Sequence, residues 1–474
     1  MQTVILQKIR YKLKHSFDSI QNERLKNNLL QAIPFWVSAI LTGFAAVMYA
    51  KAFAYAEDGL FWVLEGRKWM IFILAPIGFV LSWWLVKKYA PYSKGSGIPQ
   101  IMAAVELSVP KERRKIKSLL GLRIIVVKVI SSVILAFGGG AIGREGPTIQ
   151  ISSSIFKFIN QILPKWWPKV SNKNMIMTGA AAGLSAAFNT PIGGIVFAIE
   201  ELTKTHMSYF KTALFAGVII SGLTAQFLAG PYLYIDSPRI EGIGYAVVWP
   251  VLLISFFCGI TSSYSSKLML GINRFRKTKL KNDFQQVLFL VCIATFIASC
   301  YYFIYDCQIL GSGKEIMTTS LNKHFYYEWY TPFFRMIGSA LSFTSGGAGG
   351  VFAPALSAGA SSGATLSQLM YLSPREANVV ILAGMVAFLT GITRAPFTST
   401  MLVLEMTHQD SLIFFLMLAG IFSSLVGHIV SKHSLYEELK IGYMEELEEQ
   451  YEDRTLKRKV NLSDLVKSNQ EISK

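Results

Sequence analysis

The chain carries little charge for its length. Of its 474 residues, 16% are Asp, Glu, Lys or Arg and 52% are hydrophobic, whereas a soluble domain averages about 25% charged residues. Too little polar surface remains to face water on all sides, which excludes a water-soluble protein. The composition therefore predicts an integral membrane protein.

Cysteine and histidine are also scarce. The four cysteines (Cys258, Cys292, Cys300 and Cys307) have no CxxC spacing, and the six histidines form no matching cluster. This pattern is typical of packing cysteines, so we expect no metal site and no cofactor. An apolar segment directly after a short basic start is missing too, so no cleavable signal peptide is expected.

Five apolar runs without Asp, Glu, Lys or Arg are long enough to cross a hydrocarbon core of about 30 Å. They are Leu29–Ala50, Trp69–Val86, Val247–Ser265, Val287–Tyr305 and Leu412–Val430. The net charge of +17 does not indicate nucleic acid, because Lys and Arg stand in short segments beside these runs. That distribution is typical of positive-inside loops and predicts both termini in the cytoplasm.

The two ends of the chain differ from its apolar body. Residues 1–30 mix charges with apolar residues at helical spacing, which predicts an amphipathic cytoplasmic helix on the membrane surface. Residues 31–440 form the expected transmembrane domain. Residues 441–474 form a charged cytoplasmic tail too short for a regulatory domain of ordinary size.

An internal duplication appears when residues 177–202 are aligned, without gaps, with residues 382–407. The shift of 205 positions matches Gly179, Pro191 and Glu200 with Gly384, Pro396 and Glu405. Glycine, proline and glutamate are the residues least expected to coincide inside apolar sequence. We predict a first repeat over about 31–230 and a second over about 246–430, with a structural role for Glu405.

Three glycine- and proline-rich breaks interrupt the apolar sequence: Gly95–Pro99, Gly143–Pro147 and Gly349–Pro354. Non-helical backbone persists at membrane depth only where protein or a watery cavity surrounds it, and breaks in corresponding places of two halves indicate a substrate site. A helix that begins at such a break offers unpaired N–H groups and a partial positive charge. The three breaks together predict an anion site.

Glu145 lies within the second break. A carboxylate is itself an anion, so it competes for the N–H groups of the site and leaves when protonated. Glu145 is therefore a candidate gate and proton acceptor. The alternative is a loop glutamate paired with Arg144.

Four further polar residues each allow two interpretations. Ser96 is either a hydroxyl donor to an anion or a turn residue, and Tyr436 either returns a phenol to the pore or is an interfacial aromatic residue. Glu200 and Glu201 either end a helix at the interface or supply the second titratable station that proton transport needs beside Glu145.

The three breaks resemble the signature stretches of CLC chloride channels and transporters: Gly-Ser-Gly-Ile-Pro at 95–99, Gly-Arg-Glu-Gly-Pro at 143–147 and Gly-Gly-Val-Phe-Ala-Pro at 349–354. The resemblance continues through 188–191 and 402–407 and covers most of residues 30–440. It implies an all-α integral membrane protein built from two inverted repeats of tilted, partly broken transmembrane helices. It also implies a homodimer in which each subunit has its own anion path.

The resemblance assigns roles to individual residues. Ser96, Tyr436 and the backbone N–H groups of Val351 and Phe352 would coordinate chloride, and Glu145 would be the external gate. Gly95, Arg144 and Gly146 complete the expected chloride-binding set. The first motif continues Gln100-Ile101-Met102, where relatives often carry acidic residues, which leaves an internal ion pair with Lys128 open.

Glu201 favours a chloride/proton antiporter over a passive channel, because exchangers similar to the bacterial ones carry a glutamate at this position. Glu200 would help water and protons reach it. The expected protein is a bacterial inner-membrane transporter of chloride and protons, not an enzyme. The alternatives are a voltage- or pH-gated channel of the same fold and an intramembrane hydrolase with a serine and His428.

Overall fold

The structure is a computed structural model that describes residues 23–109, 112, 114–164, 166–168, 170–202, 211–230, 234–235, 240, 242–322 and 327–452. Within these residues the regular structure is helical, apart from two isolated bridges, Gly95–Ala348 and Gly143–Gly350. Most of the predicted N-terminal surface helix and the tail after residue 452 lie outside the described residues.

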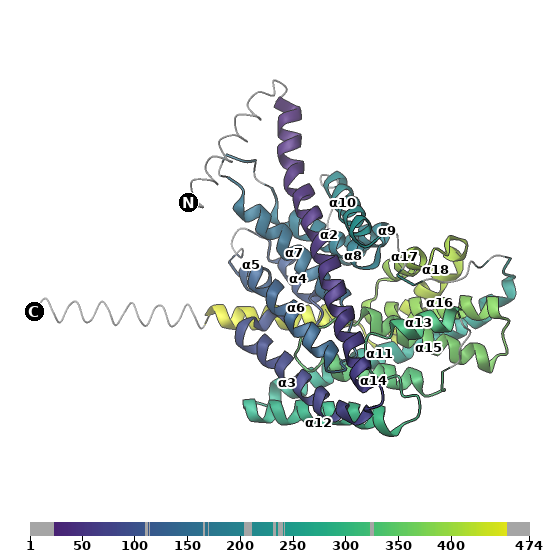
Figure 1. Cartoon of the computed structure of the whole chain (residues 1–474). Coiled ribbons are helices and arrows are strands. Elements are labelled where there is room, and N and C mark those ends of the chain that lie inside the picture. The colour runs from purple at the N-terminus through teal and green to yellow at the C-terminus, as the bar shows by residue number, and fades with distance from the viewer. Residues whose placement is uncertain are drawn as a thin grey trace, which may run out of the picture.

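The helices divide into two series of similar order (Figure 1). The first comprises α2 (Glu23–Leu64), α3 (Ile71–Tyr89), α4 (Ile98–Glu106), α5 (Ile116–Leu119), α6 (Leu122–Phe137), α7 (Glu145–Ile162), α8 (Asn172–Phe188), α9 (Pro191–Phe197) and α10 (Lys211–Ala229). The second comprises α11 (Val248–Lys279), α12 (Asp283–Phe303), α13 (Lys314–Asn322), α14 (Thr331–Phe343), α15 (Phe352–Leu369), α16 (Pro374–Thr393), α17 (Pro396–Thr407) and α18 (Ile413–Val430).

Eight stretches of the described chain are long and apolar enough to cross a membrane. They overlap all five predicted spans, although the span predicted to end at Tyr305 ends at Phe303, and they add Ile116–Phe137, Lys211–Ala229 and Pro374–Thr393. The last of these has 94% of its apolar window buried inside the protein, so its neighbours are helices and not lipid. The chain is a multi-pass membrane protein.

The duplication predicted from the sequence is present in the structure. Asn189 ends α8 and Arg394 ends α16, both in the left-handed conformation with φ of 59° and 64°, and a proline begins the next helix in each repeat. In the first series α2 packs against α8 and α10, and in the second α11 packs against α16 and α18. Equivalent helices therefore have equivalent neighbours.

A last helix occupies residues 435–452 and crosses the predicted boundary at 440. Tyr443 and Leu447 on it are 7% and 0% exposed, and Lys440 forms an ion pair of 2.8 Å with Glu106. This helix, yellow in Figure 1, thus returns to the first series. Residues 441–452, the first part of the predicted charged tail, thus form a helix that packs against the rest of the protein.

Candidate functional site

Backbone hydrogen bonds join the three breaks. The N–H of Gly95 donates to the carbonyl of Gly347 at 2.8 Å, and the N–H of Gly349 returns to the carbonyl of Gly95 at 3.1 Å. Gly143 and Gly350 exchange two such bonds at 2.8 and 2.7 Å. Segments more than 200 positions apart in the sequence therefore meet at one place.

Three helices begin at this meeting point. α4 starts at Ile98 after Gly97, whose φ of 104° suits only glycine, while α7 starts at Glu145 and α15 at Phe352. The first turn of a helix leaves N–H groups without intrahelical partners and carries a partial positive charge. The junction of the breaks is therefore suited to an anion.

Two buried hydroxyl groups lie at the same junction. Ser96 is 1% exposed and Tyr436 is 0% exposed, and the two side chains interact. Neither oxygen has a hydrogen-bond partner of ordinary geometry among the described residues. Since buried hydroxyl groups are costly without an acceptor, these two are suited to donate to a bound anion.

Gly146 and Phe352 pack closely against the two hydroxyl residues. A Cβ added to Gly146 would collide with Oγ of Ser96, so only glycine at position 146 allows the first two breaks to touch. The ring of Phe352 lies 6.2 Å from that of Tyr436, centroid to centroid. Ser96, Gly146, Phe352 and Tyr436 thus lie close together.

Glu145 is buried at this junction, with 1% of its surface exposed. Its Oε1 accepts a hydrogen bond of 2.7 Å from the phenol of Tyr234, and its Oε2 has no hydrogen-bond partner among the described residues. A Cβ on Gly143 would collide with Oε2 and lie 3.3 Å from the backbone nitrogen of Ala353. The carboxylate therefore lies beside the start of α15.

Glu201 and Tyr436 line one small cavity. Its volume of about 10 Å³ is at the lower limit for a single water molecule, and Phe352, Thr393 and Thr398 also line it. Glu201 lies in a short π-helical turn, Ala198–Leu202, that continues α9. A second carboxylate, that of Glu201, therefore lines the same cavity as the Tyr436 side chain.

The side chain of Glu200 contacts the start of α17 and not the small cavity. Its carboxylate accepts hydrogen bonds from the backbone N–H groups of Phe397 and Thr398 at 3.2 and 2.7 Å, and from the Thr398 hydroxyl at 2.7 Å. These groups form the start of α17, so Glu200 caps that helix. It does not line the cavity that Glu201 shares with Tyr436.

A larger cavity of about 590 Å³ has Gly95 and Gly346 in its lining. Its cationic side chains outnumber its carboxylates: Lys87, Lys94, Arg274, Arg276, Lys277 and Lys281 against Asp283, Glu438, Glu445 and Glu446. A surplus of positive charge in a concave site concentrates anions.

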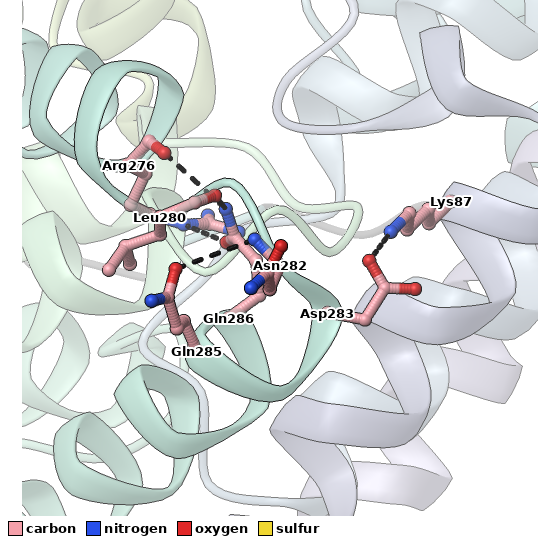
Figure 2. Close-up of polar contacts among 7 residues, drawn as sticks. All are labelled: Lys87, Arg276, Leu280, Asn282, Asp283, Gln285 and Gln286. Atoms are coloured by element: carbon pink, nitrogen blue, oxygen red, sulfur yellow. Dashed lines mark hydrogen bonds and ion pairs between the residues drawn. The ribbon is translucent and has the colours of Figure 1, made fainter.

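Hydrogen bonds fix the wall of this cavity between α11 and α12 (Figure 2). Arg276 donates to Oε1 of Gln286 at 2.8 and 3.1 Å and to the carbonyl of Thr344, while Lys87 pairs with Asp283. Arg276 thereby braces the turn that precedes the third break.

Lys128 is a buried lysine beside the first break. It is 0% exposed and donates to Oε1 of Gln150 at 2.6 Å and to the carbonyl of Ser93 at 3.0 Å. Both partners are neutral, as expected from the missing acidic residues at 100 and 102.

No motif in the sequence singles out Tyr234. Arg144 precedes α7, and its guanidinium carbon lies 5.8 Å from the centroid of the Tyr234 ring. His428 is exposed and contacts the Ser424 carbonyl of its own helix, and among the described residues no hydrogen bond joins it to a serine hydroxyl. A lone tyrosine outside any motif gives no local signal of its distant contact with Glu145.

Known proteins resemble this chain in sequence and in fold. The chain is 28% identical over 441 residues to the H(+)/Cl(-) exchange transporter ClcA of Salmonella schwarzengrund (strain CVM19633), covering 88% of the chain and 90% of the relative. It is 29% identical over 420 residues to the ClcA of Salmonella paratyphi B (strain ATCC BAA-1250 / SPB7), covering 84% and 86%.

Two solved structures share the fold. A slow cyanobacterial Cl-/H+ antiporter superposes with a TM-score of 0.76 at 21% identity, covering 89% of this chain and 99% of that one. A CLC-type fluoride/proton antiporter superposes at 0.72 and 21% identity, covering 88% and 98%. The family profile described as voltage gated chloride channel matches residues 78–428. With the three breaks joined around one buried site, this match shows that the chain belongs to the CLC family of voltage gated chloride channels.

Proposed function

We propose that the protein is a secondary active antiporter that exchanges chloride for protons across the membrane. The observation that carries this proposal is the position of Glu145, a buried carboxylate at the junction where three helix N-termini and two hydroxyl groups meet. An anionic side chain and a transported anion compete for the same N–H groups. Protonation of Glu145 would release the site to chloride.

Chloride would be held without a full positive charge in direct contact. Ser96 and Tyr436 would donate their hydroxyl groups, and Val351 and Phe352 their backbone N–H groups at the start of α15. Gly95 of the first break and Gly146 of the second would complete the binding set, together with Arg144 as the charged neighbour of Glu145 in the second break. Chloride would enter from the basic 590 Å³ cavity that ends at Gly95.

The proton would leave Glu145 toward Glu201. Support comes from the small cavity that Glu201 shares with Tyr436, because one water molecule there would shorten the gap between the anion site and the carboxylate. Glu200 would act on this route by fixing the start of α17, whose Thr398 lines the cavity. The relatives named as H(+)/Cl(-) exchange transporters agree with exchange.

The expected setting is a bacterial inner membrane, with the basic cavity and both termini on the cytoplasmic side. A two-fold homodimer with one path in each subunit is the expected assembly. The test is chloride efflux from liposomes that contain the purified protein, recorded with the external pH. Efflux accompanied by proton uptake supports exchange, whereas efflux that ignores an imposed pH gradient supports a passive channel.

A further inference from the structure

Tyr234 is a buried residue that the chloride and proton assignments above do not use. It is 3% exposed, and its hydroxyl donates to Oε1 of Glu145 at 2.7 Å across 89 positions of sequence. The N–H of the next residue, Ile235, donates to the carbonyl of Met406 in α17 at 3.2 Å. The backbone that carries the phenol is therefore anchored to the second repeat.

Aromatic and cationic neighbours hold the ring of Tyr234. Phe188 meets it edge to face at 4.8 Å and lies nearly parallel to Phe352 at 6.3 Å. The guanidinium carbon of Arg144 and the Nζ of Lys314 lie 5.8 and 5.1 Å from the ring centroid. Cations at this distance are attracted to the ring, so its orientation toward Glu145 is held from several sides.

Fixed backbone supports the Lys314 side of this group. Glu57 of α2 accepts from the N–H of Ser312 at 2.6 Å and from its hydroxyl at 3.2 Å. Buried Arg335 donates to the carbonyls of Leu310 and Gly311 at 2.8 and 3.0 Å. The loop before α13 is thereby tied to α2 and α14.

We infer that Tyr234 is a latch that holds ionised Glu145 in the closed position and so sets how readily chloride displaces it. A phenol that donates to a carboxylate stabilises the charged form more than the neutral one. Tyr234 acts through Glu145 and is a positioning residue, and this role rests on the proposed chloride transport. Besides Glu145, the titratable groups around the latch are Tyr49, Glu57, Arg144 and Lys314.

The test compares chloride efflux from liposomes for the wild type, Tyr234→Phe, Glu145→Ala and the double variant. Tyr234→Phe should raise efflux about tenfold where Glu145 is ionised, because a hydrogen bond to a charged group is lost. It should also move the half-maximal efflux to higher pH. In the Glu145→Ala background the same change should have no effect. Tyr234→Leu should raise efflux in the same direction.

Tyr49→Phe is the matched control, since it removes a buried phenol that bonds Ser132 at 2.7 Å and not Glu145. Wild-type efflux and pH profile in Tyr234→Phe, or an equal change with and without Glu145, would overturn the latch. Efflux of chloride without protons in the wild type would instead contradict exchange alone, because the latch is measured by chloride flux.

Discussion

Glu200 and Glu405 cap each other's repeats. Glu200 accepts from the backbone N–H groups of Phe397 and Thr398 at the start of α17, and Glu405 accepts from those of Ile192 and Gly193, at 3.0 and 2.6 Å, at the start of α9. The end of each short helix therefore meets the beginning of its equivalent. The two helices run antiparallel, as inverted repeats require.

This reciprocal contact predicts that both carboxylates stabilise the fold. Glu405→Ala should lower the free energy of unfolding by about 1 kcal/mol, because two helix N-terminal N–H groups lose their acceptor. Thermal unfolding of the detergent-solubilised protein measures the loss, and Glu315→Ala, at an exposed position of α13, is the control. An unchanged midpoint would show that the caps contribute nothing, whereas an altered chloride-to-proton ratio would give Glu405 a role in transport.

Glu201→Gln should stop proton movement and leave chloride flux in place. The amide keeps the size of the side chain beside the small cavity but does not accept a proton in the physiological range. Chloride and pH electrodes record both fluxes from the same liposomes. Continued coupling in this variant would remove Glu201 from the proton path.

Glu145→Ala should give chloride flux that does not depend on pH and moves no protons. The substitution removes both the competing anion and the proton acceptor at the junction of the breaks. Efflux measured across the acid to neutral range provides the profile. A profile that keeps the wild-type pH dependence would place the gate at another residue.

Gly146→Ala should weaken chloride binding, since the new Cβ collides with Oγ of Ser96. Overpacking typically costs roughly 1–3 kcal/mol, and a cost of that size at the binding site corresponds to an affinity loss of about 5- to 150-fold. Calorimetric titration with chloride measures the change. Gly271→Ala is the control because its Cβ would meet no atom within 4 Å, and equal affinity in both variants would contradict the geometry of the site.

The sequence predicts the parts of the site that carry local signals. Glycine–proline breaks identify Ser96, Glu145 and Phe352, because glycine and proline inside apolar sequence mark the places where the helices are interrupted. Tyr234 has no such signal, since its contact with Glu145 depends on how the segment after α10 returns to the second repeat. The small cavity beside Glu201 likewise arises from side chains of several helices.

The missed spans have different physical reasons. Ile116–Phe137 contains Lys117, Arg123 and Lys128, and the burial of Lys128 with neutral partners becomes visible only in the folded chain. Pro374–Thr393 begins with charged residues that belong to its first turn. The omission of Lys211–Ala229 has no physical reason, because this span carries a single charge, at its first residue, and its composition already identifies it as a membrane span.

The central claim is that one carboxylate, Glu145, both competes with chloride and carries the proton. The most direct measurement imposes an outward chloride gradient on liposomes whose external pH is higher than the internal pH. Chloride leaving through the protein should drive protons inward against their own gradient, and Glu145→Ala should abolish this uptake while chloride still leaves. Protons that only follow their own gradient, whatever the chloride gradient, would contradict the account.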